Sequence, residues 1–200
     1  MKLKFCFFCV SILLISFTRC FADSVWQWSV KVNSVSLDNA HNHPRAFLWI
    51  PPNCKYVRGI VVGQNNMLEE GILQDDSFRK TLTGLGFAEI FFAPTFDYWQ
   101  NASKNDSVNI KFNEVLKQLA CRSGYLELKD APIIPIGHSA MASFPWNFAA
   151  WNPNRTLAIL SIHGDAPLTN LVGNGRPNVI WGKHNIDGVP ALMVMGEYEW

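Results

Sequence analysis

The sequence predicts an α/β fold, in which helices cover both faces of a mostly parallel sheet. Short apolar runs typical of buried strands alternate along the chain with longer runs whose apolar residues recur at helical spacing. Strands that alternate with helices in this way form parallel sheets joined by right-handed crossovers. Hydrophobic residues make up 48% of the chain, which is enough for one sizeable core. We therefore expect a single domain over residues 23–200.

The first two strands are predicted at residues 26–32, where apolar and polar residues alternate, and at residues 45–50, where a pair of prolines stops the run. These two strands are expected to be antiparallel. Residues 59–62 are wholly apolar, which is typical of a strand buried on both faces. The elements expected after them are a helix capped by Asp75 or Asp76 and ending at Gly84 or Gly86, a strand at 88–93, a helix over 110–120, a strand at 131–136, a helix over 143–151, and strands at 157–162 and 191–195.

The N-terminus is predicted to be a secretory signal peptide that ends at Ala22. Two lysines precede an apolar stretch at residues 5–17, and a small residue occupies the expected cleavage site. The apolar stretch is shorter than the roughly 20 residues that a membrane-spanning helix needs. Lipidation of Cys20 is the alternative, although Arg19 fits poorly before a lipidation site. We therefore expect a secreted or periplasmic protein that loses residues 1–22 and has no membrane span in its mature form.

The charge balance argues against a nucleic-acid partner. Removal of the signal peptide takes away three of the 17 basic residues and leaves 14 against 16 acidic ones, a net charge of −2. No basic run is present to neutralise a phosphate backbone. Cys54 and Cys121 remain, and in an oxidising compartment they are candidates for a disulfide. The sequence shows no spacing of zinc ligands, so neither a metal nor an organic cofactor is expected.

The most informative motif is the turn at Ser139. The apolar run of residues 131–136 ends in Gly137, His138 and Ser139, and small residues able to begin a helix follow. This layout is typical of a nucleophile elbow, a strained strand-to-helix turn that lifts a serine hydroxyl above a parallel sheet. The glycine leaves room where the chain doubles back. The N–H of Ala140 would face the same space, and it is a candidate donor to a developing oxyanion.

From these residues onward the chain resembles the α/β-hydrolase family, whose nucleophile motif is Gly-x-Ser-x-Gly. The resemblance covers residues 26–200, with the elbow as its specific motif. The sequence departs from that motif at Met141, which stands where the family has its second glycine. In the family, that glycine lets the helix pack closely on the neighbouring strands. Pro145 cannot lie deep in a helix, because it lacks an N–H and clashes with the preceding turn. We therefore expect the helix to begin regularly near Ser143.

The resemblance implies a second oxyanion donor in the loop after the third strand, residues 63–67. This sequence lacks the His-Gly-Gly form of that loop. By position, the backbone N–H of Gln64 or of Asn65 is the candidate, and the sequence does not decide between them. An ordinary polar turn is the other interpretation, since glycine and asparagine favour turns in any case.

The resemblance also implies a catalytic acid after a late strand. Residues 190–199 resemble the family's strand followed by Gly-x-x-Asp, with a glutamate, Glu199, at the acidic position. A carboxylate there would orient the histidine base and stabilise its cation. Glu197 is a nearby substitute, and Asp165 after the preceding strand is a less usual location.

No histidine of the chain fits the expected position of the catalytic base. In the family the order is serine, acid, histidine, with the histidine on a loop after the last strand. The five histidines all precede the proposed acid: His41, His43, His138, His163 and His184. A serine without a nearby base is a poor nucleophile, so a base is required. Within the chain, His163 and His184 are the alternative candidates for it. The resemblance therefore implies a domain incomplete at its C-terminus, with its last elements and its base beyond Trp200.

These observations predict an exported serine hydrolase, most simply an esterase acting on a small-molecule or polysaccharide-linked ester. The loop after the fourth predicted strand carries aromatic residues that either stack on such a ligand or belong to the core: Phe96, Tyr98 and Trp99. A catalytically inactive hydrolase fold that binds carbohydrate or another ligand is the alternative, which Met141, Pro145 and the missing histidine favour. A peptidase is disfavoured, because the sequence shows no acidic clamp or additional domain to recognise a peptide terminus.

Overall fold

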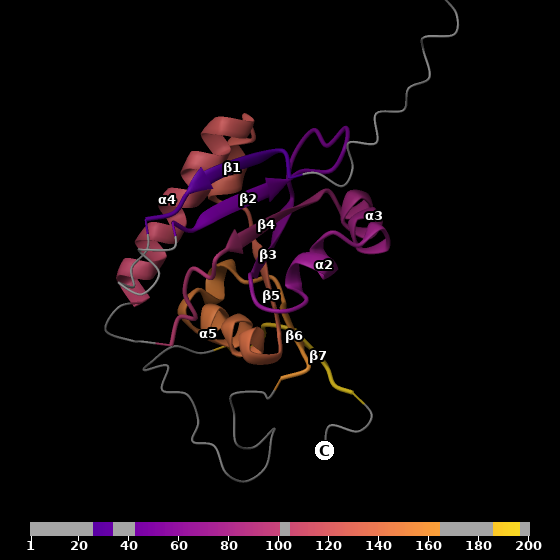
Figure 1. Ribbon diagram of the computed structural model, residues 1–200. Coiled ribbons are helices and arrows are strands. Elements are labelled where there is room, and N and C mark those ends of the chain that lie inside the picture. Colours follow the sequence, from indigo (N-terminus) through magenta and orange to yellow (C-terminus); the bar gives the residue numbers. More distant parts are fainter. Residues whose placement is uncertain (1–25, 34–42, 101–104, 165–185, 197–200) are drawn as a thin grey trace, which may run out of the picture.

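Seven strands form one sheet in the order β1-β2-β4-β3-β5-β6-β7 (Figure 1). The computed structural model describes residues 26–33, 43–100, 105–164 and 186–196. The strands are β1 Trp28–Lys31, β2 Arg45–Trp49, β3 Gly59–Gln64, β4 Phe87–Ala93, β5 Ile133–His138, β6 Ile159–Ile162 and β7 Ala191–Val194. β2 is antiparallel to both β1 and β4, and the other neighbouring strands are parallel. The prediction of an α/β fold with a mostly parallel sheet is therefore confirmed.

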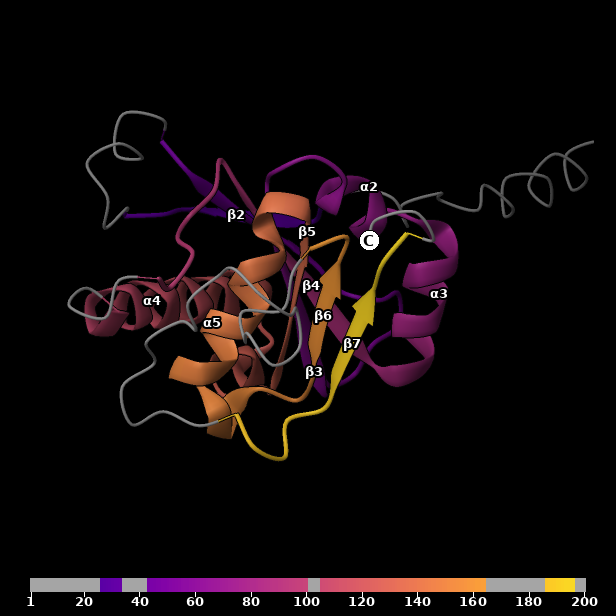
Figure 2. The same ribbon diagram turned by 90° about the horizontal axis from the view of Figure 1, so that it is seen from below.

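Helices cover both faces of this sheet. Figure 2 shows α3 on one face, and α4 and α5 on the other. The helices are α2 Glu69–Leu73, α3 Asp76–Leu85, α4 Asn105–Ser123 and α5 Ser143–Trp151, and the short 3-10 turns are η1 Leu126–Lys129, η2 Ser139–Ala142 and η3 Pro153–Arg155. The caps predicted for α3 are confirmed. The Asp75 carboxylate accepts the N–H of Phe78 at 2.8 Å, and Gly86 ends the helix in the left-handed conformation, with φ of 70°.

An apolar core lies on each side of the sheet. The larger one is under α4 and α5, and its aromatic rings pack with centroids 5.2 to 6.0 Å apart. Phe96 and Trp99 are both completely buried in it, so these two residues belong to the core and do not form a ligand platform. Tyr98 packs against the same cluster and is only partly buried. The smaller core lies under α2 and α3, around Leu73 and Leu82.

The candidate disulfide is not formed, because Cys54 and Cys121 are both free thiols. The Cys54 Sγ donates to the carbonyl of Tyr56 at 3.3 Å. Tyr125, two residues after the end of α4, contacts this segment, because its hydroxyl donates to the Cys54 carbonyl at 2.6 Å. Cys121 lies on α4 and is exposed.

The expected signal peptide, residues 1–22, lies outside the described residues and stays a prediction. Within the part of the chain that the structure describes, no helix is both long and apolar enough to cross a membrane.

The strand order changes direction between β3 and β5. From β3 the chain passes to β4 on one side, and after α4 it continues to β5 on the other side. Loops that leave the C-terminal ends of two such strands turn to opposite faces, and open α/β sheets usually bind their ligands at this switch point. The loop after β3 and the Ser139 turn after β5 both start from this edge of the sheet.

Candidate active site

Ser139 has the strained backbone that a nucleophile elbow requires. It follows β5 directly and has φ of 54°, in the left-handed region that serine rarely adopts. A Cβ atom at Gly137 would lie 2.1 Å from the backbone carbonyl oxygen of Met141, so the chain can double back here only at a glycine. Ser139 is half-buried, and Ala140 beside it is exposed. The strand-to-helix turn therefore has the geometry that the sequence predicts.

The helix after the elbow begins late, as the sequence also predicts. Ser139–Ala142 form the 3-10 turn η2, and α5 starts at Ser143 with Pro145 in its first turn. Met141 is completely buried and belongs to the same core as Phe144. The methionine in place of the second glycine is accommodated by this delayed helix start, which leaves Ser139 in its strained position.

The loop after β3 differs from the expectation in the part that Gln64 and Asn65 play. Gln64 is the last residue of β3, and its buried side chain binds the loop after β4. Its carbonyl accepts the N–H groups of Phe96 and Asp97 at 2.8 and 3.0 Å, and its amide donates to the Asp97 carbonyl at 2.6 Å. The N–H of Asn65 donates to the Phe92 carbonyl at 2.7 Å, so it is already engaged in the sheet. The strand continues two residues beyond its predicted end, through Gln64.

Asn66 and Glu69 connect this loop to the elbow, and neither was a candidate from the sequence. The Asn66 side chain donates to the carbonyl oxygen of His138 at 2.9 Å. The completely buried Glu69 carboxylate accepts three backbone N–H groups, those of His138, Met67 and Leu68. The only sequence signal for Glu69 is an acidic pair where a helix can start. Its partners are backbone groups, one of them 69 positions away, which no residue pattern reveals.

Two histidines lie beside the elbow. His138 is 8% exposed, and its Nδ1 has no hydrogen-bond partner among the described residues. Its ring lies 5.4 Å from the ring of His163, centroid to centroid. His163 follows β6 with φ of 51°, and its N–H donates to the Val194 carbonyl at 2.7 Å. Neither imidazole is hydrogen-bonded to the Ser139 hydroxyl in the part of the chain that the structure describes.

The remaining polar candidates stay predictions. Glu199, Glu197 and Asp165 lie outside the described residues, as do His41 and His184. Within the described ranges, no group of three or more His, Cys, Asp or Glu side chains gathers as a metal site.

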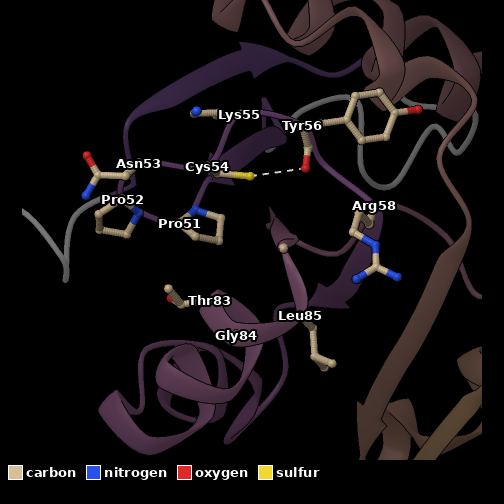
Figure 3. A pocket seen from close by; sticks show the side chains of 11 residues that line it. Pro51, Pro52, Asn53, Cys54, Lys55, Tyr56, Arg58, Thr83, Gly84 and Leu85 are labelled. Atoms are coloured by element: carbon tan, nitrogen blue, oxygen red, sulfur yellow. Dashed lines mark hydrogen bonds between the residues drawn. The ribbon is translucent and has the colours of Figure 1, made fainter.

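The surface cavity drawn in Figure 3 has a volume of about 390 Å³. It lies at the opposite end of the sheet from Ser139. It is lined by the connection between β2 and β3, from Pro51 to Arg58, and by the end of α3. These segments lie where β3 and β4 begin, whereas Ser139 follows the end of β5. The cavity is therefore not the place where a substrate of Ser139 binds.

No protein-family model matches the chain, and no curated protein matches it in sequence. Solved structures do match. The enterobactin esterase Fes from Shigella flexneri aligns with a TM-score of 0.51 and 14% identity, over 82% of this chain and 44% of that one. The chain has an α/β-hydrolase-type fold.

Two further structures of similar fold are an acetyl xylan esterase from Aspergillus awamori and FphF, a fluorophosphonate-binding serine hydrolase from Staphylococcus aureus. The first has a TM-score of 0.46 and 17% identity, over 70% of this chain and 53% of that one. The second has a TM-score of 0.47 and 14% identity, over 81% and 68%. This α/β-hydrolase-type chain thus spans about half the length of the Aspergillus enzyme. At 14% identity, the likeness to the Shigella enzyme shows the fold alone.

Proposed function

We propose that this chain carries the nucleophile of an exported serine hydrolase that cleaves carboxylic esters. The observation that supports the proposal most directly is the left-handed backbone of Ser139, at a turn that only a glycine at position 137 permits. Such strain costs on the order of 1–3 kcal/mol and persists mainly where a function uses it. The turn also lies at the switch point of the sheet, where ligands usually bind.

In the proposed reaction, the Ser139 Oγ attacks the carbonyl carbon of the ester and its proton passes to a histidine outside the described residues. The bond to the alcohol oxygen then breaks, and the alcohol leaves with that proton. A water molecule, deprotonated by the same histidine, attacks the acyl-serine, releases the carboxylic acid and restores the serine. Glu199 orients the histidine and stabilises its cation.

We assign the oxyanion of each tetrahedral intermediate to the backbone N–H groups of Ala140 and Asn66. Ala140 follows the nucleophile directly and is exposed. In the β3 loop, the N–H of Asn65 donates to Phe92, and the N–H groups of Met67 and Leu68 donate to the side chain of Glu69. The N–H of Asn66 has no acceptor among the described residues, and its side chain already contacts the elbow. This assignment replaces Gln64 and Asn65 by the next residue of the loop.

The first test is to label the complete natural protein with a fluorophosphonate probe and to map the modified peptide. We expect labelling at Ser139 that the substitution Ser139→Ala abolishes. The same substitution should lower the turnover of p-nitrophenyl acetate by about 10³-fold or more, because an activated serine is lost. A folded protein that neither labels nor hydrolyses the ester would contradict the proposal.

The substrate class that we propose is an ester outside the cell, on a small molecule or on a polysaccharide, because an exported enzyme meets such esters. The substrate class is tested by measuring three activities: release of acetate from an acetylated polysaccharide, release of acetate from p-nitrophenyl acetate, and cleavage of a peptide. Ester cleavage without peptide cleavage is the expected result.

A ligand-binding protein on an inactive hydrolase fold is the second candidate. One observation favours it: among the described residues, no histidine is hydrogen-bonded to the Ser139 hydroxyl to activate it. Saturable binding of an oligosaccharide by the unlabelled protein, unchanged by Ser139→Ala, would support this candidate over the esterase.

A further inference from the structure

Glu69 joins the two segments that supply the proposed oxyanion donors. Its side chain is completely buried at the first position of α2. One carboxylate oxygen, Oε1, accepts the N–H of His138 at 2.8 Å. The other, Oε2, accepts the N–H groups of Met67 and Leu68 at 3.0 and 3.2 Å. A single side chain therefore fastens the end of the β3 loop to the residue before Ser139.

Asn66 fastens the same loop from its other side. Its Nδ2 donates to the His138 carbonyl oxygen at 2.9 Å, so side chains of the loop bind both the N–H and the C=O of His138. Apolar packing contributes little to this attachment, because Met67 and Leu68 are 73% and 53% exposed. The position of the loop over the elbow thus depends on these polar contacts.

A buried carboxylate near the proposed oxyanion has two disadvantages. Its removal from water is costly, and its negative charge opposes the charge that develops on the substrate. The carboxylate can nevertheless hold the loop in place, since hydrogen bonds to a charged acceptor are stronger than those between neutral groups. Oxyanion donors need a fixed position, because their N–H groups must lie within about 2.7–3.1 Å of the oxygen on which the negative charge develops.

We propose that Glu69 is a positioning residue, which sets the separation between the N–H of Asn66 and the N–H of Ala140. The inference rests on the proposed function, and it names the side chain that keeps the two donors at a fixed distance. Glu69 itself touches no reacting atom. Its loss therefore lowers turnover and leaves substrate affinity unchanged.

The test is Glu69→Gln in the complete natural protein, with p-nitrophenyl acetate as substrate. Glutamine has the same size, but its amide accepts through one oxygen only. It can satisfy either His138 or the loop, and it presents its own N–H groups to the other. We expect kcat to fall about 10- to 100-fold with KM within about twofold, and the rate of fluorophosphonate labelling at Ser139 to fall by the same factor as kcat.

Glu127→Gln is the matched control. The Glu127 Oε1 accepts the N–H of Val57 at 2.7 Å, a bond of the same kind between distant segments, near the start of β3 and far from the elbow. The glutamine oxygen can still accept this single N–H, so this variant should keep both kcat and most of its stability. The proposal is overturned if kcat falls no further in Glu69→Gln than in Glu127→Gln, or if Glu69→Gln raises KM and leaves kcat unchanged.

Amide hydrogen exchange of the wild-type protein separates this inference from the proposed function, and it serves as well if Glu69→Gln does not fold. The amides of Met67 and Leu68 should exchange slowly although their side chains are exposed, and fast exchange at both positions overturns the inference. Wild-type protein that neither labels nor hydrolyses contradicts the proposed function first. If the amides of Met67 and Leu68 exchange slowly in a wild-type protein without activity, Glu69 only stabilises the loop. That result also overturns its role in positioning the oxyanion donors.

Discussion

The tight turn at Gly137 permits a direct test of the elbow at the level of one residue. The substitution Gly137→Ala places a Cβ 2.1 Å from the carbonyl oxygen and 2.7 Å from the carbonyl carbon of Met141. No rotamer change can relieve a clash with backbone atoms, so the turn at Ser139 must shift. We expect the free energy of unfolding to fall by about 3 kcal/mol and labelling of Ser139 to be lost. Urea denaturation and probe labelling measure the two effects, and a variant as stable and as reactive as the wild type would show that the turn tolerates a wider path.

Individual residues of the site differ in how far the sequence could predict them. The turn at Gly137 and Ser139 was predictable, because a glycine two residues before a serine at the end of an apolar run indicates a tight local backbone turn. The end of β3 was placed two residues early, because the residue types of Gly63 and Gln64 do not show that the strand continues through them. Glu69 was missed because its partner on the elbow strand is a backbone N–H, and backbone groups leave no mark on a residue pattern.

Among the helices, α3 offers a comparison with the elbow for the same change of glycine to alanine. Gly84 lies in α3, and a Cβ added there meets nothing within 4 Å. Alanine restricts the unfolded chain and favours the helix, so Gly84→Ala should raise the free energy of unfolding by about 0.5–1 kcal/mol. The midpoint of urea denaturation measures the change. Destabilisation by Gly84→Ala would mean that the loss at Gly137 cannot be assigned to its close contact with Met141.

The periodicity of apolar residues predicted the longer helices and strands, but it did not predict the short helical elements. α3 and α4 carry apolar residues at helical spacing, and the buried strands are continuous apolar runs, so these elements were predicted, although α4 begins at Asn105, five residues before its expected start. α2 spans five residues, and η2 spans four, too few to show a period. Ser139 is the first residue of η2, and the first residue of α2, Glu69, binds the N–H of His138 beside it. The parts that position the site are therefore those that the sequence reveals least.

Across the whole molecule, the strand order brings the site together from segments far apart in the sequence. The loop after β3 and the turn after β5 meet because β3 and β5 pair in parallel, with Ile60 opposite Ile133. The sequence predicts the class of sheet from the alternation of strands and helices. The contacts across this pair could not be predicted, since each joins a side chain of the loop to the backbone of His138.

A buried ion pair also links distant parts of the molecule, on the other side of the sheet from α4 and α5. The Nε of Arg79 on α3 donates to Glu89 on β4 at 3.0 Å and to the Leu73 carbonyl at 2.8 Å. The guanidinium lies 5.1 Å from the ring of Trp26 and 4.7 Å from that of Trp49. Burial raises the pKa of Glu89 from 4.5 to about 7, although the nearby Arg79 opposes the shift.

This pKa predicts how the stability of the molecule depends on pH. Between pH 4.5 and about 7, the folded protein keeps a proton on Glu89 that the unfolded chain has released. The contribution of Glu89 to the free energy of unfolding is therefore full below pH 4.5 and is lost as the pH rises to about 7 and above, by about 3 kcal/mol in all. Glu89→Gln, which cannot ionise, should remove this slope in urea denaturation at pH 5, 6, 7 and 8. Glu114→Gln, which breaks the partly exposed pair of Glu114 with Lys111, is the control and should leave the slope unchanged. If Glu89→Gln keeps the wild-type slope, the pH dependence has another origin, and the buried pair is ionised over the whole range.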